Sequence, residues 1–335
     1  MNIRVLTNLN RLSNINCTGV EVYVISEDNL RLNMYNVLRF FRILKEYDFV
    51  IINDTATVFI LGAIKLVLPG FKCQVWMLDS WLSPPELCKG AMAKLLIKIK
   101  SFGLKGVDRI LLHSRNNDAF CNAYGISQSK ITYIPFKING YDYVVKCPTS
   151  EGSYIFSGGY SRRDYDSLIQ ACRELPYSLK ILTPAKYGNE VHRTFIDRNN
   201  LPANVEVIND DGSFESFANF VANSKFVVLP TYKLDFAATG IGVYLLSMAL
   251  GKCVVITSGP SSDLILSDKQ AVIVPPEDPV SLRSAIKKIY SDDVYRKSIA
   301  EEGQKYALSL GDEKKYYAYI LNVIASEYNK QRESL

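Results

Sequence analysis

A chain of 335 residues with 48% hydrophobic residues is long enough for two domains of ordinary size, each with its own core. The net charge of +5 is modest, and the basic segments lack interleaved aromatic residues, which argues against nucleic-acid binding. The seven cysteines are scattered without any CxxC spacing, so they favour reduced thiols in a cytosolic protein over disulfides or a zinc site.

The N-terminus is typical of a first strand, which we expect at 3–9, and not of a signal peptide. It has no charged n-region, no long apolar stretch and no small-residue cleavage site. No window holds the ~18–20 uninterrupted apolar residues that a spanning helix needs. The nearest one, 59–71, is interrupted by Lys65 and Pro69. We therefore expect a cytoplasmic protein that does not cross the membrane.

Strand and helix patterns then alternate along the chain, which predicts parallel α/β sheets. In the first half we expect strands at 22–27, 49–53, 73–78, 109–113 and 132–135, and helices at 31–45, 58–68, 91–105 and 115–124. The polar, turn-rich segment 138–152 is typical of a linker. In the second half we expect strands at 153–157, 178–182, 205–208, 226–229, 253–256 and 271–274, and helices at 164–174, 188–198, 214–223, 241–250, 279–290, 293–308 and 314–327.

Residues 89–109 have the pattern of a basic amphipathic helix. The apolar stripe consists of Met92, Leu95, Leu96, Ile99 and Phe102, and the lysines of the neighbouring face are Lys94, Lys98 and Lys105. Two interpretations stay open. Either the helix contacts an anionic membrane surface, or its apolar residues pack on the sheet and its lysines are simply solvated.

The segment YIFSGGYSRRDYDSL, which begins at residue 154, joins an apolar strand to a glycine pair, two arginines and a helix start. Gly158 and Gly159 allow the backbone N–H groups to approach an anion, and the helix start adds a partial positive charge. Arg162 and Arg163 can bind phosphate oxygens with their forked donors. The alternative is an ordinary surface connection in which Arg163 is bridged to Asp166.

A second segment, 226–257, contains a short β-branched strand closed by Pro230, the glycine loop TGIG, an apolar helix ended by Gly251 and a further strand. The order of strand, loop, helix and strand predicts a parallel sheet. Ligands of such sheets bind at the carboxyl ends of the strands.

Together these segments resemble the donor-binding half of a group 1 (family 4-like) glycosyltransferase of the GT-B fold, and AVIVPPEDPVSLRSAIKKI extends the similarity. Upstream, CTGVEVYV at 17–24 resembles the glycine loop after the family's first strand, and 107–136 resembles its Ser-bearing strand and helix. The resemblance implies two Rossmann-like domains facing across a cleft. It places an acceptor-binding domain at 1–140 and a nucleotide-sugar donor-binding domain at 150–312, with a C-terminal helix, 314–330, packing back on the first domain.

The resemblance also implies a donor site that neutralises the charge developing on the departing β-phosphate. Arg163 stands where the family has the Lys of its phosphate-binding motif, and we expect it to be catalytic. A fixed cation and a helix N-terminus are expected to do this work, with no metal ion and no cofactor. The implied donor-binding residues are Gly158, Gly159, Arg162, Arg163, Thr239, Gly240 and Tyr244.

The sequence departs from the family at its paired glutamates. Alignment on MALGK puts Ala238 at the first position and Leu246 at the second, ribose-contacting one. This departure leaves donor-ribose recognition and the stereochemical outcome open. Tyr244, Asp235 and Thr231 are candidate substitutes, and Leu246 is expected to pack in the core.

The acceptor side offers fewer signals. Asp79, at the end of a predicted strand, is our candidate for the general base that deprotonates the acceptor hydroxyl. The alternatives are that Asp79 caps a turn, or that Asp54 is the base. Thr18 and Gly19 are expected in a loop that approaches the acceptor or the donor phosphate.

These observations predict a cytosolic glycosyltransferase of the hexosyltransferase type. It would transfer a sugar from a nucleoside diphosphate sugar to a carbohydrate or lipid-linked oligosaccharide acceptor, as in bacterial surface polysaccharide biosynthesis, with peripheral contact to the anionic inner face of the membrane left open. A catalytically inactive sugar-nucleotide-binding or scaffold subunit of a polysaccharide assembly complex is the alternative. A nucleotide-sugar epimerase is disfavoured, because the first strand lacks the GxGxxG motif.

Overall fold

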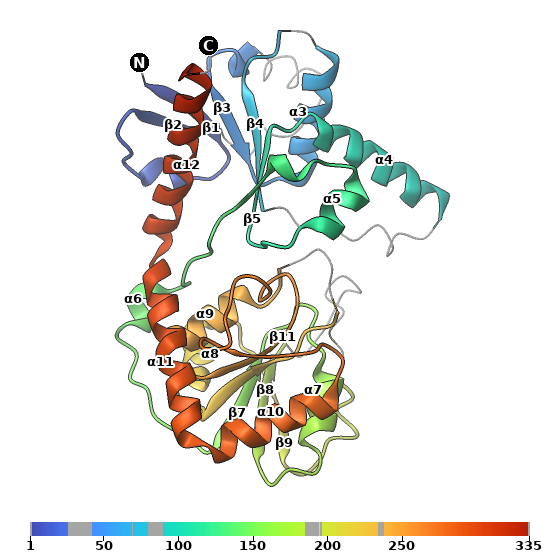
Figure 1. Ribbon diagram of the computed structural model, residues 1–335, viewed down its shortest axis with the longest axis vertical. Coiled ribbons are helices and arrows are strands. Elements are labelled where there is room, and N and C mark those ends of the chain that lie inside the picture. The colour runs from blue at the N-terminus through green and yellow to red at the C-terminus, as the bar shows by residue number, and fades with distance from the viewer. Residues whose placement is uncertain are drawn as a thin grey trace. The chain divides into compact units, whose positions relative to one another are not determined.

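The computed structural model describes residues 2–25, 42–68, 70–79, 90–184, 194, 196–233 and 238–333. The chain divides into two compact units. Unit 1 consists of Met1–Pro135 and Lys314–Leu335, and unit 2 of Phe136–Glu313. Figure 1 shows that each unit is built around its own twisted sheet with helices packed on it.

Unit 1 contains a six-stranded parallel sheet in the order β2-β1-β3-β4-β5-β6. Its central strands are continuous apolar runs, because both faces of a parallel sheet are covered. The strands are β1 (Ile3–Thr7), β2 (Val20–Val24), β3 (Phe49–Ile52), β4 (Gln74–Leu78), β5 (Arg109–Leu112) and β6 (Ile131–Tyr133). The helices are η1 (Leu12–Asn14), α3 (Thr55–Val67), α4 (Ala91–Lys105), α5 (Asp118–Tyr124), η3 (Gln128–Lys130) and α12 (Glu313–Glu333).

Unit 2 contains a second six-stranded parallel sheet, in the order β12-β11-β10-β7-β8-β9. The strands are β7 (Tyr154–Gly158), β8 (Ser178–Thr183), β9 (Val205–Asn209), β10 (Phe226–Leu229), β11 (Val254–Thr257) and β12 (Val272–Val274). The helices are α6 (Tyr141–Val144), α7 (Tyr165–Cys172), α8 (Phe214–Ala222), α9 (Ile241–Ala249), α10 (Pro279–Ser291) and α11 (Asp293–Leu310).

Successive strand residues of unit 2 enter different cores, as the alternation of a β-strand requires. Phe156 and Leu229 pack with α8 and α9 on one face of the sheet. Ile155 and Val228 pack with α7 and α10 on the other. The unit is therefore a three-layer sandwich with a core on each side of its sheet.

The strand order of unit 2 reverses at β7. From β7 the chain adds β8 and β9 on one side, and then returns to add β10, β11 and β12 on the other. The carboxyl ends of β7 and β10 thus lie side by side at a topological switch point, which is where open α/β sheets bind ligands.

The parallel α/β architecture predicted from the sequence is confirmed in both halves of the chain. The boundary between the units falls between Pro135 and Phe136, and the expected linker 138–152 lies inside unit 2, where it forms α6. Most of the expected helices 31–45 and 188–198 lies outside the described residues. In the described part of the chain, no helix has both the length and the apolar character needed to span a membrane.

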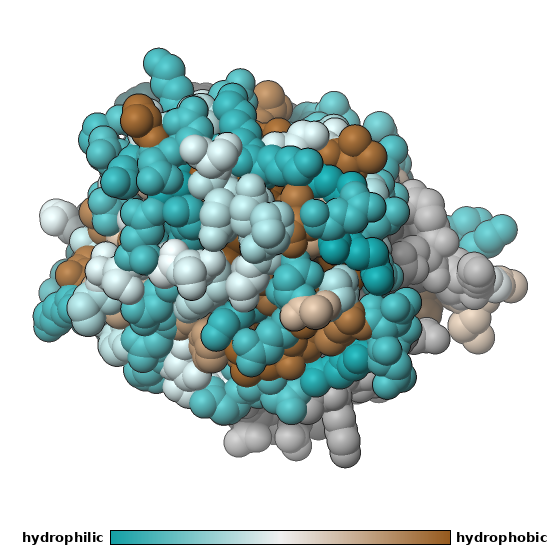
Figure 2. All heavy atoms as spheres, turned by 90° about the horizontal axis from the view of Figure 1, so that it is seen from below, coloured by the Kyte–Doolittle hydropathy of each residue, from teal (hydrophilic) through white to brown (hydrophobic). Residues whose placement is uncertain are grey.

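Hydrophilic side chains cover much of the surface visible in Figure 2, and hydrophobic ones appear in separate areas between them. On unit 2 the most exposed apolar side chains, such as Leu264, Val280 and Val294, belong to different segments. Scattered apolar residues of this kind are normal on a soluble domain.

Candidate functional site

The first candidate site lies in the loop that joins β7 to α7. β7 ends at Gly158, the chain turns at Gly159 with φ = 103°, and Arg162 has φ = 55°. Asp164 caps α7 by accepting a hydrogen bond from the backbone N–H of Ser167 at 3.1 Å. The positive φ at Gly159 explains why a glycine follows the strand, since a side chain is strained there.

Arg163 is buried at the centre of this loop, with 2% of its surface exposed. Its Nε donates to the Gly158 carbonyl at 3.1 Å, and Nη1 donates to the Ser161 carbonyl at 2.9 Å. Its backbone N–H donates to Thr194 Oγ1 at 3.0 Å. Burial lowers the pKa of Arg163 from its ordinary value, and an arginine side chain still stays protonated near neutral pH.

No ion pair among the described residues involves Arg163, and the predicted alternative of a bridge to Asp166 is not found there. A buried guanidinium with neutral partners is costly unless an anion compensates it. This cation is therefore suited to bind an anionic ligand.

Two glycines border the guanidinium of Arg163. A Cβ placed on Gly159 would lie 2.8 Å from Nη2 of Arg163, and one on Gly240 would lie 3.5 Å from Nη1. Gly240, with φ = 86°, is the N-cap of α9, whose first N–H groups have no intrahelical acceptors. The structure thus brings a fixed cation beside the positive end of a helix dipole.

The same loop lies at the switch point of the sheet. Arg163 forms a short antiparallel bridge with Thr231, just beyond β10, and the Asp164 N–H donates to the Pro230 carbonyl at 3.1 Å. The loop after β7 is therefore fixed against the end of β10. This geometry gathers predicted residues of the donor site, Gly158, Gly159, Arg163 and Gly240, into one place.

The remaining predicted donor residues have different environments. Thr239 is buried, and its Oγ1 has no hydrogen-bond partner within the described residues. Arg162 is buried, and its carbonyl accepts from the Tyr232 N–H at 3.3 Å. Tyr244 belongs to the core cluster on the α8 and α9 side, so its ring packs inside the unit rather than extending from the Gly240 loop. We correct its expected donor-binding role to a packing role.

The two positions that carry glutamates in the family have no carboxylate here. Leu246 is buried in the core, as predicted, and Ala238 packs partly buried against the same core. Asp235, a candidate substitute, lies outside the described residues. Thr231, the other candidate, hydrogen-bonds to Thr257 with 2.7 Å between the two hydroxyl oxygens, so it has a structural partner.

A second polar cluster lies in unit 1, at the carboxyl ends of β4 and β5. Asp79 directly follows β4 with φ = 30°, and its Oδ2 lies 3.4 Å from Nε2 of the buried His113, which follows β5. Nδ1 of His113 donates to the Ile134 carbonyl, at 3.0 Å, because a carbonyl only accepts. Nε2 also lies 3.4 Å from the hydroxyl of Tyr316 on α12.

The cluster holds one carboxylate in a partly shielded position. Burial raises the pKa of Asp79 above its ordinary value, and the charge of His113 opposes this shift. A carboxylate with a raised pKa is a better proton acceptor, which suits a general base. His113 and Tyr316 were not singled out from the sequence for this site. The position of His113 at the end of a predicted strand is a signal that could have identified it, whereas Tyr316 gave no such signal.

The other acceptor-side candidates are placed elsewhere. Asp54 is the N-cap of α3 and accepts from the Thr57 N–H at 2.8 Å, so its carboxylate has a structural partner. Gly19 lies at the amino end of the sheet, because its carbonyl accepts from the Ile3 N–H and Val20 pairs with Ile3. The expected role of Thr18 and Gly19 beside the acceptor residues is therefore corrected.

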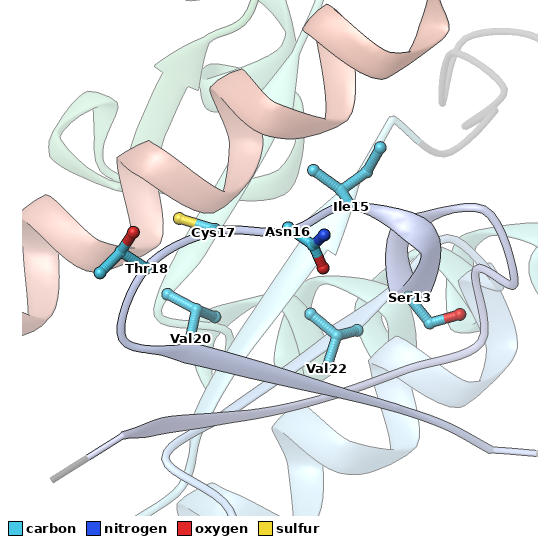
Figure 3. Close-up of a pocket in the computed structure, with 7 residues that line it drawn as sticks. All are labelled: Ser13, Ile15, Asn16, Cys17, Thr18, Val20 and Val22. Atoms are coloured by element: carbon cyan, nitrogen blue, oxygen red, sulfur yellow. The ribbon is translucent and has the colours of Figure 1, made fainter.

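Thr18 and Gly19 form the turn that leads into β2. The Val20 N–H donates to the Cys17 carbonyl at 3.1 Å, and Gly19 supplies the required φ of 79°. Thr18 lines a cavity of about 300 Å³, shown in Figure 3, which lies beside α12 and contains no charged side chain. The cavity is lined by Ser13, Ile15, Asn16, Cys17, Thr18, Val20 and Val22.

In the part of the chain that the structure describes, His, Cys, Asp and Glu side chains form no group of three or more arranged to hold a metal ion.

The family model described as glycosyl transferases group 1 matches residues 154–292, which include both glycine loops and Arg163. An uncharacterized glycosyltransferase of Methanocaldococcus jannaschii is 23% identical over 170 residues, which are 49% of this chain and 46% of the relative. The chain thus matches under half the length of that relative.

Solved structures share the fold over nearly the whole chain. Anabaena HepE in complex with UDP is 15% identical, with a TM-score of 0.69, over 97% of this chain and 100% of that one. WaaG, a glycosyltransferase involved in lipopolysaccharide biosynthesis, is 14% identical, with a TM-score of 0.57, over 96% and 99% of the two chains. Other HepE structures contain UDP-glucose or UDP and glucose.

Two parallel Rossmann-like sheets and this similarity show that the chain has the GT-B fold. Within that fold, residues 154–292 match the family model of group 1 glycosyl transferases.

Proposed function

We propose that the protein transfers a hexose-type sugar from a nucleoside diphosphate sugar to a carbohydrate or lipid-linked oligosaccharide acceptor in the cytoplasm. The observation that carries this proposal is the buried Arg163 guanidinium, which has no carboxylate partner among the described residues and lies between Gly159 and Gly240. UDP and UDP-glucose in the HepE structures support a nucleotide sugar as the donor.

In the reaction, the bond between the anomeric carbon and the β-phosphate oxygen breaks, and the nucleoside diphosphate leaves with the bonding electrons. Arg163 and the first N–H groups of α9 would stabilise the charge that develops on that phosphate. Both groups are fixed before the reaction, Arg163 by its two carbonyl contacts and α9 by its packing. Such preorganised donors cost little reorganisation energy during the reaction.

Asp79 is proposed as the general base on the acceptor side. Asp79 would remove the proton of the acceptor hydroxyl as the oxygen forms the new bond to the anomeric carbon. His113 beside it would stabilise the Asp79 carboxyl group that has taken up the proton. The raised pKa of Asp79 supports this role, because proton transfer is most effective when the base has a pKa near the working pH.

A role in bacterial surface polysaccharide assembly is the pathway that we propose. The fold similarity to a lipopolysaccharide glycosyltransferase supports it. A catalytically inactive sugar-nucleotide binder remains the second candidate, because Ala238 and Leu246 replace the carboxylates of the family's paired glutamates.

The test begins with thermal denaturation in the presence of UDP, GDP, ADP and CMP. A nucleotide at about 100 times its Kd stabilises the native state by about 2.7 kcal/mol, which raises the Tm by roughly 5–10 °C for units of this size. We expect one of the diphosphates to raise the Tm and its sugar conjugate to be turned over. Binding without turnover would assign the protein to the inactive binders, and no shift with any nucleotide would contradict the proposed function.

A further inference from the structure

Helix α4 of unit 1 exposes an apolar stripe along its length. The five side chains are between 47% and 72% exposed, and they follow one another at positions i, i+3, i+4, i+7 and i+10, which share one face of a helix. The sequence left open whether these residues pack on the sheet, and the structure shows that they do not. They are Met92, Leu95, Leu96, Ile99 and Phe102.

The stripe, at residues 92–102, precedes the part of α4 whose glycines contact α3. A Cβ on Gly106 would lie 1.9 Å from the Gly62 carbonyl oxygen, and one on Gly103 would lie 2.4 Å from the Phe59 carbonyl oxygen. The two helix backbones are therefore in direct contact through glycines near the C-terminal end of α4, where Leu104 is also fully buried. In Figure 1, α4 extends outward from unit 1 beyond this contact.

The charges on α4 are all positive. Its fifteen residues include four lysines and no acidic residue, and the ion pairs of the described residues include none of these four side chains. At 100° per residue, Lys94, Lys98 and Lys105 lie together beside one edge of the stripe, and Lys100 lies beside the other. A surface with an apolar centre and cationic edges complements an anionic lipid surface, because the apolar side chains enter the acyl boundary while the lysines contact the headgroups.

We propose that α4 binds unit 1 to an anionic membrane surface. A protein partner fits less well, since the stripe is a single helix face with cations on both sides. This binding goes beyond the proposed function and does not depend on it. If both hold, the acceptor is a molecule carried by the membrane, because unit 1 also holds the Asp79 cluster.

The experiment is sedimentation with vesicles, using the full chain. Vesicles of phosphatidylcholine with phosphatidylglycerol are compared with vesicles of phosphatidylcholine alone, at NaCl concentrations from 0.05 to 0.5 M. We expect the wild type to sediment with the anionic vesicles only, and the association to weaken as salt is added, because salt screens exposed charges. Failure of the wild type to sediment with anionic vesicles at low salt would overturn the proposal without any variant.

Two variants test the two parts of the surface. Lys94→Glu with Lys98→Glu and Lys105→Glu should lower the partition coefficient by roughly 100-fold or more, since each lysine near an anionic surface contributes about fivefold. Leu95→Gln with Ile99→Gln should also abolish sedimentation, because the apolar insertion is lost.

A control variant makes the same charge change on unit 2, at exposed lysines outside α4. It replaces Lys269, Lys287 and Lys297 with Glu, and we expect its partition coefficient to stay within about threefold of the wild type. An equal loss in the control would mean that net charge, and not α4, sets the binding. If sedimentation velocity showed a dimer that the Leu95→Gln and Ile99→Gln variant disrupts, the stripe would belong to an interface between two copies, and the proposal would be wrong.

The test is independent of the donor site. Thermal stabilisation by a nucleoside diphosphate, measured on the same variants, should be unchanged, because the donor loops lie in unit 2. Loss of vesicle binding with retained nucleotide binding separates the two proposals.

Discussion

Arg163→Ala is the substitution that tests the donor site most sharply. A guanidinium has five N–H donors. In the structure, Nε–H and one Nη1–H are used by the Gly158 and Ser161 carbonyls, so three donors remain on the side bordered by Gly159 and Gly240. Those remaining donors are the ones that would contact the diphosphate.

The expected loss follows from the strength of these contacts. A hydrogen bond to a charged group contributes about 1.5–3 kcal/mol, so removal of the guanidinium should weaken nucleoside diphosphate binding by about 10- to 150-fold. Arg163→Lys keeps the charge without the planar fork, and we expect an intermediate loss. Arg173→Ala removes an exposed arginine of the same unit and should leave affinity unchanged.

The assay is isothermal titration calorimetry of the wild type and the three variants with the diphosphate that gives the largest thermal shift. Arg163→Ala also leaves two carbonyls without donors, so urea denaturation of each variant must show that it is folded at the titration temperature. An unchanged Kd in folded Arg163→Ala would refute the reasoning. So would an equal loss in Arg173→Ala.

Four further predictions concern the acceptor cluster and the α3–α4 contact. Asp79→Asn should lower turnover by about 100-fold or more at unchanged donor affinity. Asp54→Asn should lower only the stability, because the α3 cap is lost. The reverse pattern in steady-state kinetics would make Asp54 the base. His113→Phe removes the charge that opposes the raised pKa of Asp79, so the acidic limb of the kcat/KM profile should move to higher pH; a limb that stays in place would exclude the coupling. Because the folded state binds the Asp79 proton more tightly than the unfolded chain does, this group's contribution to stability falls as the pH rises above about 4, and Asp79→Asn should remove that slope from urea denaturation measured across pH. Gly106→Ala should lower the free energy of unfolding by about 1–3 kcal/mol or more, because its Cβ would meet the Gly62 carbonyl oxygen. The control Gly259→Ala, whose Cβ would meet no atom within 4 Å, should change that free energy by under about 1 kcal/mol. Equal effects would show that the helices do not pack through these glycines.

The donor loop could be predicted from the sequence because its signals are local. Gly158, Gly159 and Arg163 lie within six residues, and a glycine pair after an apolar strand indicates a turn at the carboxyl edge of a sheet. The partner loop at Gly240 carries the same kind of signal before α9. Parallel sheets bring such loops to one edge, so their proximity follows from the topology.

The acceptor cluster could be predicted only in part, because its contacts are not local. Tyr316 and His113 are 203 residues apart, and no local pattern indicates that α12 would bring its hydroxyl to β5. For Gly19, a local sequence pattern was present but predicted the wrong position. Its glycine loop resembles a ligand-binding loop, but residues 8–19 carry the chain back to the amino end of the sheet before β2 starts, so the loop's sequence alone did not reveal its position.

The stripe on α4 could be predicted from helical spacing, whereas its exposure could not. Exposure depends on where α3 meets α4: the backbone contact through Gly62, Gly103 and Gly106 is at the C-terminal end of α4, after the stripe residues 92–102. Periodicity shows which residues share a helix face, but it does not show how far along that helix a neighbouring helix covers them.

The central claim, that the chain is an active glycosyltransferase with its donor site at Arg163, is tested most directly by measuring nucleoside diphosphate release. The purified chain is incubated with UDP-, GDP- and ADP-sugars, with and without a membrane lipid extract as the source of acceptor. We expect one donor to release its diphosphate at a rate proportional to enzyme, faster with the extract, and at least 10-fold more slowly with Arg163→Ala at subsaturating donor. No release from any donor by the folded wild type, or release unaffected by Arg163→Ala, would contradict the account.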